Sequence, residues 1–328
     1  RGEGKEPRMK RAIPPAKLMP GDILLYRGVG LVSDAIRFID RSQVSHSAVF
    51  LGRHGEMGRT VGEAIREGVV RRELPKSTEH AEWVESRRLK APPATLEPVL
   101  ERAACYLERG ERYAFEQILL LAFLCITRSL AGSSALGRFL RVTLDAAAEF
   151  LLQLVRTGRE PMICSEFVCR CYREGLPGSL DVPERAPGGR AADVGKMHGI
   201  RRGSTLAALI DSRGGAPAEG VVDLPALAGM SRPADASAVD EAIRDYLDDV
   251  QKRPPRAARI DLELSGLEPS LVRFSGALFR ARTLPGEGPL PRAAAMDALF
   301  EAAADFVTPG DLQRSRSLAF CGKLKTRE

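Results

Sequence analysis

Short apolar runs bounded by glycine dominate the first third of the chain. GDILLYRG at 21–28 and SHSAVFLG at 45–52 are rich in Ile, Leu, Val and Phe. TVGEAIREGVVRREL at 60–74 contains two more such runs, separated by Glu67 and Gly68. Runs of this length between turn residues are typical of strands. We therefore predict an antiparallel sheet in this part of the chain.

Between and after these runs, the apolar positions take helical spacing. LVSDAIRFIDRS places Leu31, Ala35, Phe38 and Ile39 on one face, with Ser33 as the expected N-cap. Further helices are predicted over 95–110, which Gly110 would end, and over 115–130, 134–157 and 293–306. The predicted antiparallel sheet is therefore accompanied by several helices.

Changes in composition divide the chain into four predicted segments. Residues 1–17 form a lead-in, and 18–175 form the main domain with a helical segment at 115–157. Residues 176–295 are rich in Pro, Gly and Arg, and we interpret them as a large insertion or second lobe with an unknown partner. Residues 296–328 close the main domain. Because the first residue is Arg, we expect the true amino terminus to lie upstream, which leaves a cytoplasmic and a cell-envelope location both open.

Charge and aromatic content argue against one class of function. The net charge of +6 arises from 49 Lys and Arg dispersed among 43 Asp and Glu, not from a basic block. Aromatic residues make up 5% of the chain, so few aromatic rings are present on which nucleic-acid bases could stack. Nucleic-acid binding needs clustered cations, so we expect none. The apolar run 118–126 is far shorter than the roughly 20 residues that span a bilayer.

The segment PMICSEFVCRCY at 161–172 carries three of the six cysteines. A zinc site would need a second ligand pair nearby, and a disulfide within one short helix has poor geometry. We expect Cys169 and Cys171 to be buried as small apolar residues. Cys164 differs because Pro161 places it in the first turn of a helix, where free N–H groups and the helix dipole favour a thiolate. It is either a nucleophile or an inert first-turn cysteine.

A thiolate nucleophile needs a base, and the chain has four histidines. His46 lies within a predicted strand, where alternation puts Ala48 and Phe50 on its face. His54 lies in a predicted turn, His80 among charged residues and His198 in the loosely patterned region, and all three are expected to be solvated. Glu63 in the neighbouring strand could orient the imidazole. The alternatives are a structural histidine and a surface glutamate on an edge strand.

Taken in order, GDILLYRG, SHSAVFLG, GEA, GVV, RYAF and CSEFVCRCY resemble the circularly permuted NlpC-type papain-like cysteine hydrolases of the YiiX-like branch. In that branch the histidine precedes the cysteine, as it does here. The resemblance covers about residues 18–172 and resumes near TPGDLQRSRSL. It implies a circularly permuted papain-like α+β fold, in which an antiparallel sheet packs against helices, with a large insertion at 176–295.

The resemblance also implies site residues: Cys164 as nucleophile, His46 as base and Glu63 as its orienting acid. Tyr26 and Tyr113 match positions near the cleft. We expect substrate contacts from these two and from Ser45 and Ser165, which adjoin the histidine and the cysteine. Ala114 departs from the acidic or polar residue expected in the RYAF motif, which weakens any inference about substrate.

The implied activity is cleavage of an amide bond through a thioester acyl-enzyme, with no metal and no cofactor. The expected substrate is a peptide, a peptidoglycan fragment or a lipid acyl group. A lipid-active thiol hydrolase or acyltransferase is the first alternative, because the apolar stripes of 115–157 could form a peripheral membrane contact. A non-catalytic interaction module on the same fold is the second.

Overall fold

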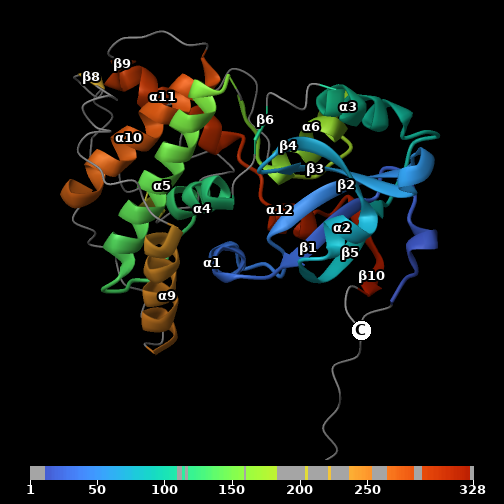
Figure 1. The fold of residues 1–328 in the computed structure, drawn as a ribbon, viewed down its shortest axis with the longest axis horizontal. Helices are drawn as coiled ribbons and strands as arrows, with labels where there is room; N and C mark the ends of the chain where they lie inside the picture. The colour runs from blue at the N-terminus through green and yellow to red at the C-terminus, as the bar shows by residue number, and fades with distance from the viewer. Residues whose placement is uncertain are drawn as a thin grey trace, which may run out of the picture.

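A six-stranded antiparallel sheet forms one side of the molecule (Figure 1). The computed structural model describes residues 12–108, 113–114, 117–158, 160–182, 204–205, 221–222, 236–252, 264–283 and 290–325. The strand order is β10-β5-β1-β2-β3-β4. The strands are β1 (Ile23–Gly28), β2 (His46–Arg53), β3 (Arg59–Ile65), β4 (Gly68–Glu73), β5 (Ala81–Leu89) and β10 (Leu318–Lys325). Four of them, β1 to β4, confirm strands predicted from the sequence.

The two faces of the sheet are covered by different elements. Ile23, Leu25 and Val49 point to one face, which packs against α6 (Cys164–Gly175) and α3 (Glu97–Glu108). Leu24 and Phe50 belong to a separate apolar cluster on the other face, which carries the short helix α2 (Leu74–Thr78). The alternation predicted for the histidine-bearing strand is therefore confirmed.

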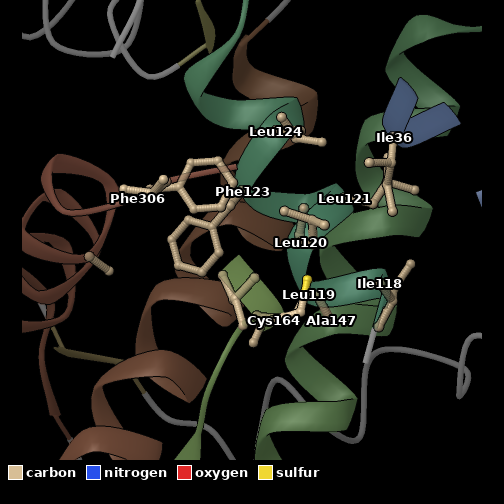
Figure 2. Close-up of a cluster of buried hydrophobic side chains, with 14 of the residues drawn as sticks. Ile36, Ile118, Leu119, Leu120, Leu121, Phe123, Leu124, Ala147, Cys164 and Phe306 are labelled. Atoms are coloured by element: carbon tan, nitrogen blue, oxygen red, sulfur yellow. The ribbon is translucent and has the colours of Figure 1, made fainter. Parts of the chain in front are cut away.

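Helices make up the other side of the molecule, beside the sheet (Figure 1). They are α4 (Gln117–Thr127), α5 (Leu136–Arg156), α9 (Ala236–Lys252), α10 (Leu264–Arg282) and α11 (Arg292–Ala304). α4 is apolar on all sides, and every residue from Ile118 to Thr127 is buried. Figure 2 shows Phe123 of α4 against Phe306, and the two rings stack with centroids 5.1 Å apart. Such an all-apolar helix belongs in a core.

The apolar stripes predicted over 115–157 are used inside this core. Leu136, Phe139, Leu140, Leu151 and Leu154 of α5 are buried, and α5 packs on α4, α9 and α10. Among the residues described, no helix combines the length and the hydropathy needed to cross a membrane.

α1 (Leu31–Asp40) lies between the two sides and packs on both α4 and α9. The expected cap is wrong, because Gly30 is the N-cap and Ser33 sits inside the first turn. The buried Ser33 hydroxyl instead donates to Gln117 Oε1 at 3.4 Å. The expected apolar face is confirmed at Ala35 and Ile39, whereas Phe38 remains 41% exposed.

Two pairs of short strands and two separate 3₁₀ turns add to these elements. β6 (Tyr113–Ala114) and β7 (Glu160–Pro161) run parallel, and β8 (Val221–Val222) pairs with β9 (Leu290–Pro291). Single 3₁₀ turns lie at η1 (Pro15–Lys17) and η2 (Gly55–Met57). Most of 183–235 and 253–263 lies outside the described residues, as does Gly110. The predicted segment boundaries stay predictions.

The chain returns to the sheet through α12 (Pro309–Arg314) and β10. The buried Asp40 carboxylate anchors this return, because it accepts hydrogen bonds from Thr308 Oγ1 at 2.8 Å and from the Gly310 N–H at 3.1 Å. Arg314 donates to the same carboxylate at 3.2 Å. β10 then pairs with β5 along the sheet edge. Residues 307–325 are thus joined to elements formed by the first ninety residues.

Candidate active site

Cys164 is the first residue of α6, as the sequence predicts. Ile163 precedes it in an extended conformation and serves as the N-cap, and its N–H donates to Glu166 Oε2 at 3.3 Å. The first N–H groups of a helix have no partner within it, so the Cys164 side chain sits at the positive end of the helix dipole. Cys164 has no exposed surface, and Figure 2 shows it among the apolar side chains of α4 and α5.

The position of α6 depends on a close approach to the sheet at Gly62. A Cβ at Gly62 would lie 3.2 Å from Cζ of Phe167, one turn along α6 from the cysteine. The missing side chain lets the Phe167 ring rest on β3 and holds the helix start beside the strands that carry His46 and Glu63.

His46 and Glu63 form the contact that the sequence predicts. His46 Nε2 lies 3.0 Å from Glu63 Oε2, across the neighbouring strands β2 and β3. The Glu63 side chain is 2% exposed and that of His46 is 12% exposed. The alternative of a surface glutamate on an edge strand is wrong, because β4 lies outside β3 in the sheet.

Two more hydroxyl groups extend this contact. Ser77 of α2 donates to Glu63 Oε2 at 3.1 Å, and the Tyr26 hydroxyl lies 2.8 Å from Ser77 Oγ. An ionised carboxylate only accepts, so the single hydroxyl proton of Ser77 is directed at Glu63. Tyr26 must then donate to Ser77. Burial, followed by the Glu63 charge, raises the pKa of Tyr26 well above its ordinary value and keeps that donor protonated.

The same argument fixes the proton on the histidine. Because Glu63 accepts, Nε2 of His46 carries a hydrogen, which leaves Nδ1 for the side-chain hydrogen bond with Cys164. Burial alone would lower the pKa of His46, but the interactions with Cys164 and Glu63 outweigh it and raise the pKa to about 10. His46 is therefore held as an imidazolium between the Cys164 side chain and the Glu63 carboxylate. The arrangement can hold a charged Cys–His pair and move a proton within it.

A pocket of about 280 Å³ opens beside the histidine. Most of its lining residues carry a polar or charged group, and Cys164 is not one of the lining residues. The lining residues are Tyr26, Gly28, His46, Glu63, Ile65, Arg66, Glu67, Arg72, Ser77, His80, Ala81 and Gln117.

The residues predicted to contact substrate lie in different surroundings. Tyr26 lines the pocket. Ser45 and Ser165 are fully buried, outside the pocket wall, and already bonded: Ser45 Oγ accepts from the Gly28 N–H at 3.2 Å, and Ser165 Oγ donates to the Val307 carbonyl at 2.6 Å. These contacts give both serines a structural role. Tyr113 begins β6, but its side chain lies outside the described part of the chain.

The remaining candidates are placed as follows. Cys169 and Cys171 are buried, which confirms their predicted packing role, and burial raises the pKa of the Cys171 thiol well above its ordinary value. His54 and His80 are exposed, as predicted, and His198 lies outside the described residues. Within the described ranges, no three His, Cys, Asp or Glu side chains gather as they would around a metal ion.

Ser77 is the member of this site that sequence patterns do not reveal. Its segment, ELPKST, has no apolar periodicity and carries no recognised motif, so nothing in the sequence alone points to a contact with Glu63. The nearest signal is Pro75, which favours the start of a helix at this point.

Comparisons with known proteins give a distant likeness. No protein-family model and no curated protein matches this chain. Among solved structures, it is similar to the crystal structure of the metalloprotein YiiX from Escherichia coli O157:H7, with 18% identity and a TM-score of 0.33. The match covers 60% of this chain and 82% of that one. So distant a likeness carries no argument about chemistry, and the case for the site depends on its geometry.

Proposed function

We propose that this protein is a cysteine hydrolase that cleaves an amide bond through a thioester acyl-enzyme. The observation that supports it is the position of His46, which bonds on one side to Cys164 at a helix N-terminus and on the other to the buried Glu63. A base that contacts the nucleophile on one side and an orienting acid on the other is the signature of this chemistry.

Each residue has a defined part in the proposed reaction. His46 holds the proton of Cys164, and the thiolate attacks the carbonyl carbon of the substrate. The backbone N–H of Cys164 faces the developing oxyanion at the helix start. Imidazolium then gives its proton to the leaving amine, and neutral His46 accepts a proton from the water that releases the acyl group. Glu63 keeps Nδ1 directed at the sulfur throughout.

The polar groups that line the pocket favour a peptide-like substrate over a lipid. The pocket wall offers hydroxyl, carboxylate, guanidinium and amide groups, which suit the hydrogen-bonding groups of an amide substrate. The apolar stripes of α4 and α5, which carried the lipid alternative, are covered by other helices. The lipid alternative therefore lacks an exposed apolar surface in that segment.

The proposal is tested by the ionisation of Cys164, which can be read without a substrate. The ultraviolet absorbance of the thiolate is measured against pH for the wild type, and the titration of Cys164→Ser is subtracted from it. We expect a thiolate signal at pH values where an ordinary thiol, with a pKa of about 8.5, stays protonated. In His46→Ala that low-pH signal should disappear. An acyl probe with a chromogenic leaving amine then reports whether the thiolate is acylated, because thioester formation at Cys164 breaks the amide bond and releases the amine.

Cys171→Ser is a matched control on the same helix. Its buried thiol should add nothing to the low-pH signal, so its titration should match that of the wild type. A Cys164 that ionises like an ordinary thiol in both wild type and His46→Ala contradicts the proposal. That result would favour the non-catalytic interaction module.

A further inference from the structure

The hydrogen bonds that Glu63 accepts from Ser77 and His46 meet at one carboxylate oxygen. Oε2 receives both, at 3.1 and 3.0 Å. Oε1 is buried without a hydrogen bond and forms an ion pair with Arg72 Nη1 at 3.7 Å. The terminal bond of a glutamate side chain rotates easily, so the contacts of the two oxygens decide which one faces the histidine. Ser77 donates to the same oxygen as His46.

We propose that Ser77 is a positioning residue for Glu63 and that Tyr26 in turn fixes the Ser77 hydroxyl. This inference rests on the proposed function. It gives Tyr26 a role other than the substrate contact predicted from the sequence. Tyr26 and Ser77 act through Glu63 and His46, and neither takes part in bond making.

The elements that carry the two hydroxyls are suited to this role. Tyr26 lies on β1, next to the histidine strand, and its ring packs edge-on to the imidazole with centroids 5.2 Å apart. Ser77 comes from α2, whose Leu74 is buried in the same apolar cluster as Tyr26. Both donors are thus anchored in the packed face of the sheet, so they are in place before any substrate binds.

The order in which the hydroxyl groups donate, from Tyr26 to Ser77 and from Ser77 to Glu63, predicts how the variants behave. Ser77→Ala removes one of the two hydrogen bonds that hold Glu63 Oε2, so the carboxylate can turn away from His46 Nε2. A carboxylate that is turned away supports the imidazolium less. We expect the rise of the Cys164 thiolate signal to move upward by about one pH unit. With a probe substrate, kcat should fall about tenfold, whereas KM should change little.

Two further variants separate positioning from simple loss of structure. Ser77→Thr keeps a hydroxyl and should restore the wild-type pH profile. Thr78→Ala removes the next hydroxyl of α2, which donates only to the backbone carbonyl of Pro75 at 3.1 Å, and should leave the profile unchanged. A wild-type profile in Ser77→Ala, or an equal shift in Thr78→Ala, overturns the inference.

The serial arrangement gives a second test. Tyr26→Phe keeps the ring and removes the donor to Ser77, so we expect a smaller shift in the same direction. In the Ser77→Ala background, Tyr26→Phe should add no shift, because the group it acts on is gone. Additive shifts would overturn the chain Tyr26–Ser77–Glu63. Failure of this inference can be told apart from failure of the proposed function. If the proposed function is wrong, His46→Ala will also leave the thiolate signal unchanged.

Discussion

In the sheet part of the molecule, charged and hydroxyl side chains are buried in hydrogen-bonded series, whereas the helical part buries mainly apolar side chains. The series Tyr26–Ser77–Glu63–His46 lies on β1, α2, β3 and β2. In the helical part, Phe123, Phe274 and Phe306 pack ring on ring, and the ion pairs of Arg138 lie at the surface.

The difference indicates what each part contributes. Burying a polar group costs free energy unless it is fully paired, so a buried polar series is retained where it has a use. Apolar burial contributes stability without directing chemistry. Substitutions in the sheet part should therefore change reactivity, and substitutions in the helical part should change the free energy of unfolding.

The largest effect is expected from Glu63→Gln. The amide keeps the shape of the carboxylate but removes the charge that supports the imidazolium, and it can present the wrong hydrogen-bonding group to Nε2. We expect kcat with an acyl probe to fall by about three to four orders of magnitude, with an unchanged thermal midpoint.

Glu149→Gln is the matched control for that substitution. Glu149 of α5 accepts from Arg273 at 3.0 Å in the helical part, so its loss should affect stability and leave kcat unchanged. Equal losses of activity in the two variants would contradict the division between the parts.

The next largest effect is expected in the helical part, on stability and not on activity. Phe274→Ala removes a fully buried ring of α10 that packs edge-on against Phe123, with centroids 5.6 Å apart. We expect the free energy of unfolding to fall by about 3–5 kcal/mol, measured by urea denaturation. Activity per folded molecule should stay at the wild-type value. A loss of kcat beyond the loss of folded protein would show that the helical part takes part in the chemistry.

A smaller effect is expected at the junction of the two parts. Burial would raise the pKa of Asp311, but Arg128, Arg314 and the Thr308 backbone together hold it below its ordinary value of 3.8. A depressed pKa gives stability that is present above the unfolded value and lost as the pH falls through the folded one. The free energy of unfolding of the wild type should therefore fall more steeply below about pH 4 than that of Asp311→Asn. The extra loss in the wild type should be about 1 kcal/mol. Parallel curves from acid denaturation would contradict this.

The smallest effect is expected at Arg138 of α5. It pairs with Glu241 and Asp245 of α9 at 2.9 and 2.8 Å, but its side chain is 44% exposed. Exposed ion pairs contribute little because water and salt screen them. Arg138→Ala should leave the thermal midpoint within experimental error at high salt. A clear drop there would show that α9 depends on these pairs.

Periodicity made much of this fold predictable. Strands β1 to β4 and helices α4 to α6 follow apolar patterns that a sequence displays directly. Strand β5 was not predicted because its sequence, AEWVESRRL, lacks an apolar run. Its charges are satisfied by partners that only the fold supplies, as when Arg88 binds Asp22 at 2.6 Å.

The site was predictable to the extent that its residues lie in recognisable elements. Cys164 follows a helix-start signal, and His46 and Glu63 lie in neighbouring strands. Ser77 lies in a short polar segment, and its bond to Glu63 depends on how α2 folds back over the sheet. The bonds of Asp40 to Thr308 and Gly310 join residues 268 and 270 positions apart, a separation at which one sequence carries no signal.

The hydrogen bond from Ser165 to Val307 has a consequence for biosynthesis. Val307 follows Ser165 by 142 positions, so the ribosome makes the partner of the first turn of α6 long after Cys164, His46 and Glu63 have emerged. The anchoring of α12 to Asp40 and the pairing of β10 with β5 are equally late. A nascent chain therefore carries its candidate nucleophile while the 142 residues from Ser165 to Val307 are added, without the contacts that fix the surrounding helix. Assembly of the reactive group has to wait for a segment that is made well after the group itself.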